Sequence, residues 1–77
     1  MNVTLYTKQD CSLCEEAEAL LRRFQRQHQF DLELVDIEAD DAAHALYWAR
    51  IPVVTVDGAE VASAPIDVSQ LQAALKA

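Results

Sequence analysis

The sequence predicts one α/β domain, residues 1–77, with strands and helices in the order βαβαββα. Three observations predict it. Two segments with alternating apolar residues, 2–7 and 30–37, flank a stretch with the period of an α-helix. Asp57-Gly58 separates two further apolar runs, which is typical of a β-hairpin. No linker, repeat or low-complexity segment interrupts this order.

The first strand, helix and second strand form a parallel crossover unit. In residues 2–7, Val3 and Leu5 alternate with polar or aromatic residues, as in a strand. The helix then shows one apolar stripe: Leu13, Ala17, Leu20, Leu21, Phe24 and His28. Two signals compete for its start, because Asp10 can cap it or Ser12 and Glu15 can form a capping box. Either choice leaves Cys11 at the mouth of the helix.

The second helix is expected from Ala42 to Ala49, with Asp40 and Asp41 at its start. It must end near Arg50, because a residue that precedes proline disfavours helical geometry. Its core side is expected to carry Ala43, Leu46 and Tyr47. Trp48 has two interpretations, ordinary packing or contact with a protein partner.

The last third of the chain predicts a hairpin and a helix. Residues 53–56 and 59–62 are the expected strands, joined by a type I′ turn at Asp57-Gly58. Asp67 and Gln70 then resemble a capping box at the start of the last helix. Val68, Leu71 and Leu75 recur on one face of that helix.

Composition excludes several classes of function. Thirteen acidic and six basic residues give a net charge of −7, which disfavours nucleic acids and anionic membrane surfaces. No apolar run approaches the roughly 20 residues that span a bilayer. The N-terminus lacks the basic and apolar regions of a secretory signal, so we expect a cytoplasmic protein.

Cys11-Ser12-Leu13-Cys14 holds the only two cysteines of the chain. Two thiols at the first turn of a helix can close into a disulfide, and the helix N-terminus stabilises a thiolate. After a strand and within a βαβ pattern, this spacing predicts a thioredoxin-like redox motif. A zinc site would need a second pair of ligands, and the only histidines are His28 and His44. We therefore expect redox chemistry and no metal site.

These residues carry a family resemblance. Tyr6-Thr7-Lys8 after the strand, Cys11 and Cys14 on the helix, and Arg50-Ile51-Pro52-Val53 before the hairpin resemble the glutaredoxin family of the thioredoxin fold, over essentially the full chain. The resemblance implies a single glutaredoxin-like domain with a four-stranded mixed sheet and helices on both faces. It also implies that Pro52 is a cis-proline facing the disulfide and that the Ile51 backbone binds the substrate chain.

The implied activity is that of a small thiol-disulfide oxidoreductase and electron carrier in cell redox homeostasis, without a bound cofactor. Cys11 would attack a protein or glutathione mixed disulfide, and Cys14 would resolve the intermediate. Lys8 matches the family's basic residue and would favour the thiolate. Asp10, Glu15 and Glu16 oppose it, so we predict a Cys11 thiolate less stabilised than in strongly oxidising relatives.

The source of electrons stays open. Family members that use glutathione carry a Gly-Gly pair before the last helix, followed by an aspartate. Here the stretch from Ala62 to Asp67 has no glycine, although Asp67 matches the aspartate. Glutathione and a thioredoxin-reductase-type enzyme both remain candidate reductants.

Two other hypotheses belong to different classes. The chain could be a thioredoxin-fold binding module without redox turnover, or it could share an iron–sulfur cluster between two copies, as some glutaredoxins do. For the oxidoreductase we expect a monomer that acts on a disulfide-containing protein.

Overall fold

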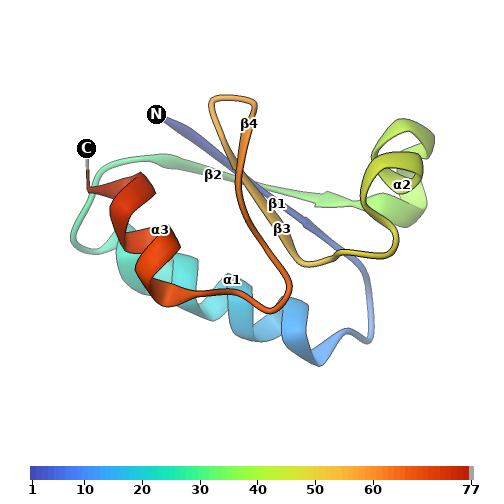
Figure 1. Cartoon of the computed structure of the whole chain (residues 1–77), viewed down its shortest axis with the longest axis horizontal. Helices are drawn as coiled ribbons and strands as arrows, with labels where there is room; N and C mark the ends of the chain where they lie inside the picture. The colour runs from blue at the N-terminus through green and yellow to red at the C-terminus, as the bar shows by residue number, and fades with distance from the viewer. Residues whose placement is uncertain (77) are drawn as a thin grey trace.

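The computed structural model describes residues 1–76 and contains the predicted mixed sheet. The elements follow in the expected order: β1 (Asn2–Thr7), α1 (Ser12–Gln25), β2 (Asp31–Asp36), α2 (Asp41–Tyr47), β3 (Val53–Val56), β4 (Ala59–Ser63) and α3 (Val68–Leu75). A short 3₁₀ turn at Ile37–Ala39, which the sequence pattern did not predict, joins β2 to α2. The strand order is β2-β1-β3-β4 (Figure 1). The fold is therefore α/β and thioredoxin-like.

β1 is central and fixes which side chains face the core. It pairs in parallel with β2 and antiparallel with β3, and Leu5 lies opposite both Leu34 and Val54. Side chains alternate between the two faces of a strand. Val3 and Leu5 therefore point to one face, while Thr4 and Tyr6 point to the other.

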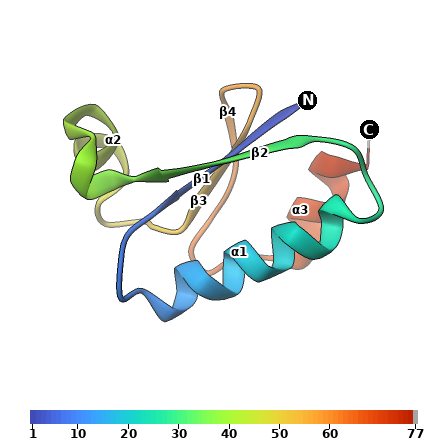
Figure 2. The ribbon, with the colours of Figure 1, turned by 180° about the vertical axis from the view of Figure 1, so that it is seen from behind.

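α1 and α3 lie side by side on the face to which Val3 and Leu5 point (Figures 1 and 2). The stripe predicted for α1 supplies Ala17 and Leu21 to this layer, and α3 supplies Leu71 and Leu75. The buried cluster consists of Val3, Leu5, Ala17, Leu21, Phe30, Val54, Ala62, Leu71 and Leu75. This layer holds α1, and with it both cysteines, against the central strand.

α2 contacts the opposite face of the sheet, at the end where β2 finishes (Figures 1 and 2). Its contact is aromatic: the ring centroids of Tyr47 and Tyr6 are 4.5 Å apart. The prediction that Leu46 is a core residue is wrong, since its side chain is 64% exposed. A helix of seven residues meets the sheet through Ala43 and Tyr47 alone, which leaves Leu46 outside. Trp48 is exposed to the same extent, so core packing does not account for it.

The hairpin follows its turn prediction. Asp57 and Gly58 have φ angles of 48° and 88°, and two positive values in succession are what a type I′ turn requires. β4 differs from the prediction by a bulge, because Val54 pairs with Ala62 while Thr55 pairs with Glu60, which leaves Val61 as the extra residue.

Within residues 1–76, no helix has both the length and the apolar character needed to cross a bilayer.

Candidate functional site

Cys11 and Cys14 are joined by a disulfide at the first turn of α1, with their Cα atoms 5.2 Å apart. Cys11 itself is the N-cap: its Sγ accepts a hydrogen bond from the Cys14 amide at 3.2 Å. Both predicted caps are therefore wrong. Asp10 has a φ of +56°, outside the extended region that an N-cap adopts, and Ser12 is already the first helical residue.

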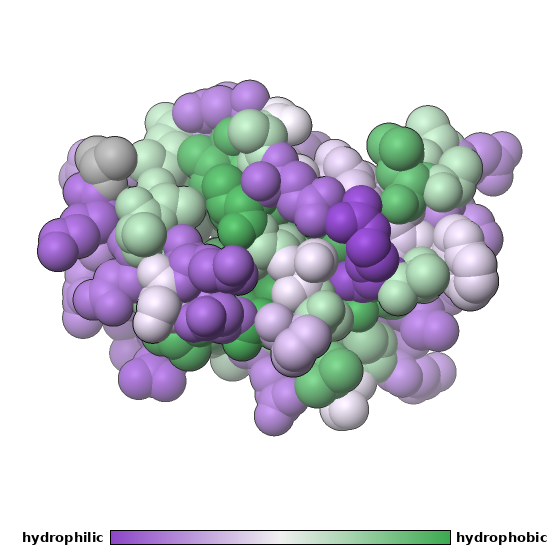
Figure 3. Space-filling view, in the orientation of Figure 1, coloured by the Kyte–Doolittle hydropathy of each residue, from purple (hydrophilic) through white to green (hydrophobic). Residues whose placement is uncertain are grey.

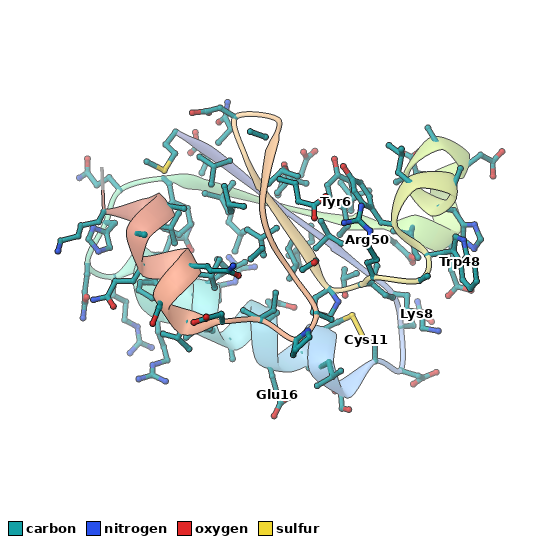
Figure 4. All side chains as sticks on the ribbon, viewed as in Figure 1. Tyr6, Lys8, Cys11, Glu16, Trp48 and Arg50 are labelled. Atoms are coloured by element: carbon teal, nitrogen blue, oxygen red, sulfur yellow. A yellow bond between two sulfur atoms is a disulfide. The ribbon has the colours of Figure 1, made fainter. Side chains whose placement is uncertain are left out.

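The two sulfurs have different access to solvent. Cys14 is 1% exposed, whereas Cys11 is partly exposed at the end of the helix (Figure 4). A helix N-terminus favours negative charge, and the Cys14 amide points at the Cys11 sulfur. After reduction, these groups would stabilise an anionic Cys11 sulfur that a substrate can reach.

Two loops form the wall beside the disulfide. The Ile51–Pro52 bond is cis, the isomer that the resemblance implies, and Ala64–Pro65 is also cis. The Ala64 amide donates a hydrogen bond to the Arg50 carbonyl at 3.2 Å, which joins the loop before β3 to the loop after β4. Pro52 is buried, and it lines a groove together with α1 residues.

The other predicted site residues lie in different places. Ile51 is half-buried beside Pro52. Lys8 is exposed and lines a separate hollow with Asp10 and Glu15. Asp67 caps α3 by accepting the Ser69 amide at 2.8 Å, and it does not line the groove. Within the described part of the chain, no three His, Cys, Asp or Glu side chains come together as a group that could hold a metal ion.

Sequence reasoning missed the role of Arg50 in shaping this wall. Its guanidinium lies 2.6 Å from a Glu60 oxygen and 5.5 Å from the centre of the Tyr47 ring. The side chain thus ties the loop before β3 to both α2 and β4 (Figure 4). No local pattern marks such a residue, because its partners lie in other elements.

Sequence reasoning also missed Glu16 as a lining residue of the groove. A signal was present, since Glu16 lies three residues after Leu13 and four before Leu20, on the edge of the apolar stripe. Glu16 therefore interrupts the apolar stripe of α1 near its first turn, where the helix carries the two cysteines.

Tyr6 lies on the face of the sheet opposite α1, and its pKa provides a test of its burial there. Burial raises the pKa of Tyr6 above its ordinary value of 10.0, and the negative charges of Tyr47, Asp40 and Glu33 raise it further, while a hydrogen bond with Thr55 opposes them. At a pH between the ordinary pKa of tyrosine and the higher pKa of folded Tyr6, the folded protein keeps the phenolic proton and the unfolded chain has lost it. We expect the free energy of unfolding to fall as the pH rises from about 10 through the folded-state pKa.

Urea unfolding of the wild type and of Tyr6→Phe across this pH range measures the effect. The variant should show the smaller decline with pH, since it lacks this proton. Equal declines in the two proteins would contradict the assignment.

Comparisons with known proteins agree with this geometry. The family model described as Glutaredoxin-like domain (DUF836) matches residues 2–76. No protein of curated function matches the chain. Two solved structures, from Nitrosomonas europaea and X. campestris, are each 32% identical to it, with TM-scores of 0.82 and 0.78. Both alignments cover 96% of this chain, and they cover 89% and 95% of those chains respectively.

A third solved structure is similar in fold and in part of its sequence. It is the glutaredoxin-like protein NrdH-redoxin from Escherichia coli, described as having a thioredoxin-like activity profile. The identity is 26% and the TM-score 0.54, and the alignment covers 78% of this chain and 79% of that one. A cysteine pair in this fold is typical of thiol redox proteins.

Proposed function

The chain belongs to the glutaredoxin-like domain family, and from this premise we propose that it is a dithiol-disulfide oxidoreductase that reduces a disulfide in a protein substrate. One observation carries the proposal. The cysteine pair closes into a disulfide whose two sulfurs differ in access, with Cys11 partly exposed and Cys14 at 1% exposure. A nucleophile and a protected resolving thiol need this difference.

The proposed reaction transfers two electrons from the dithiol to the substrate. The Cys11 thiolate attacks one sulfur of the substrate disulfide, so that a mixed disulfide forms and the other substrate sulfur leaves as a thiolate. Cys14 loses its proton and attacks the Cys11 sulfur, which closes the Cys11–Cys14 bond and releases the second substrate thiolate. Both substrate thiolates take up protons from solvent. An external thiol reductant then restores the dithiol.

The substrate chain would bind beside Pro52, through backbone hydrogen bonds to Ile51. The position of Pro52 in the wall of the groove supports this proposal. Lys8 would favour the Cys11 thiolate through its charge, at the long range that its place in a separate hollow allows. The proposed setting is the cytoplasm, where thiols are kept reduced.

A thioredoxin-reductase-type enzyme is the proposed electron donor, and glutathione is the alternative. The similarity to NrdH-redoxin, with its thioredoxin-like activity profile, supports the first. The net charge of −7 also disfavours the binding of glutathione, which is an anionic tripeptide. Parallel assays with glutathione and its reductase, and with a thioredoxin reductase, would separate the two donors.

A redox titration tests the proposed activity. We expect one reversible two-electron couple within the span of about −180 to −270 mV covered by known carriers. Trapping of thiols by alkylation, followed by mass spectrometry, measures the reduced fraction at each potential. A pair that does not exchange with any model disulfide would instead support a binding module.

A further inference from the structure

A groove runs along α1 from the first turn of the helix, which also carries the disulfide. Leu13, which lies between the two cysteines in sequence, forms one end of it. The cavity measures about 210 Å³, and its lining is mostly apolar and includes Leu13, Glu16, Pro52, Ala64, Pro65 and Ile66. Leu13 is 55% exposed, so an apolar side chain between the two cysteines in sequence is open to solvent. Figure 3 shows apolar surface at the lower edge of the molecule, where Figure 1 places the first turns of α1.

Glu16 is the one charged side chain among the residues that line this groove within the described chain. It is exposed and extends from the outer side of α1, whereas Lys8 lies on the other side of Cys11 in the same view (Figure 4). No basic residue lines the groove beside Glu16. The charge at this rim is therefore negative.

The opposite wall has few donors for an anionic ligand. The Ala64 amide is already bonded to the Arg50 carbonyl at 3.2 Å, and Pro65 has no N–H group. The nearby Asp67 carboxylate caps α3 and adds a second negative charge beyond Ile66. A carboxylate placed here would meet apolar carbon and like charge.

We propose that this groove binds a segment of the protein substrate that presents an aliphatic side chain next to its disulfide, with a Lys or Arg beside it that pairs with Glu16. This proposal rests on the proposed function and names its class of substrate. The aliphatic side chain would cover Leu13 and Pro65, and the cation would meet Glu16 at the rim. The net charge of −7 would speed the encounter with such a basic segment.

The test uses three disulfides with the reduced wild-type chain. One is the small neutral disulfide of 2-mercaptoethanol. The other two are peptides with a Leu before and either a Lys or a Glu after a cysteine that is joined to 2-mercaptoethanol. Stopped-flow rates, each divided by the rate on the neutral disulfide, remove the intrinsic reactivity of Cys11 from the comparison. We expect the Lys peptide to react faster than the Glu peptide.

Glu16→Gln should lower the ratio of Lys-peptide to Glu-peptide rates by about two- to fivefold, the range of an exposed ion pair. Added salt should lower the wild-type ratio in the same direction. Glu15→Gln is the matched control, because Glu15 is the neighbouring residue on α1 and has the same charge but lines the hollow with Lys8 instead. It should leave the ratio nearly unchanged.

Leu13→Ala tests the aliphatic part, and its exposure keeps the substitution away from the core. This arm adds a fourth disulfide, the Lys peptide with Ser in place of its Leu. Leu13→Ala should reduce the preference for the Leu peptide over the Ser peptide. An unchanged Leu preference, or equal effects of Glu16→Gln and Glu15→Gln, would overturn the groove assignment. Failure of the wild type on the neutral disulfide would instead overturn the proposed function, so the two failures are distinguishable.

Discussion

We expect that replacing Cys14 by serine yields a chain that captures the substrate of the proposed reaction and does not release it. Cys11 still attacks the substrate disulfide, but no second thiol is present to break the mixed disulfide. The release of reduced substrate should fall by at least about 10³-fold, as expected when a reacting nucleophile is removed. Non-reducing electrophoresis with mass spectrometry of the trapped species measures the result. The captured partner identifies the physiological substrate.

Cys11→Ser is the matched control, since it also leaves one thiol. That thiol is Cys14, which is 1% exposed, so we expect neither a mixed disulfide nor turnover. Circular dichroism should show that both variants remain folded. Serine also caps a helix well at position 11, the N-cap, and Cys14→Ser replaces a single sulfur atom by oxygen in the first turn. Efficient trapping by Cys11→Ser would reverse the assigned roles of the two sulfurs.

Leu5→Ala should remove much of the stability of the domain. Leu5 is 0% exposed on the central strand, between the helical layer and both neighbouring strands. Truncation of a buried leucine leaves a cavity and costs about 2–5 kcal/mol. The expected free energy of unfolding of the whole domain is only roughly 4–12 kcal/mol for 77 residues. Urea unfolding, followed by circular dichroism, should show a large decrease in the midpoint.

Leu34→Ala provides the comparison within the same sheet. Leu34 lies directly opposite Leu5 on β2, but it is 40% exposed at the edge of the sheet. Its truncation should cost less than about 1.5 kcal/mol, since much of the side chain is already in water. Equal losses in the two variants would contradict the central place given to Leu5 in the core.

The order of elements could be predicted because local signals determine it. The alternation around Val3 and Leu5, the stripe on α1 and the pair Asp57-Gly58 each act over a few residues, and each prediction of an element is confirmed. Asp67 likewise caps α3 as expected. The start of α1 could not be predicted, because the positive φ of Asp10 leaves the capping position to a cysteine sulfur.

The groove could not be predicted from local sequence patterns. Its walls come from α1, from the loop that contains Pro52 and from the loop that contains Pro65, and only the folded sheet brings these segments together. Sequence reasoning did find the cysteine pair, whose spacing has a chemical meaning by itself. It did not predict that Glu16 lines the groove or that the Arg50 side chain contacts Glu60 and Tyr47, because these roles depend on which side chains lie opposite them.

With the proposed redox function, the burial of Cys14 also bears on how the reduced chain would respond to peroxide. An oxidant in solution would reach Cys11 and convert its thiolate to a sulfenic acid. The Cys14 thiol, one helical turn away and shielded from the same oxidant, would then condense with that sulfenic acid, and water would leave. The product would be the Cys11–Cys14 disulfide, which the proposed electron donor can reduce. We therefore expect the buried thiol to protect the exposed one against irreversible overoxidation.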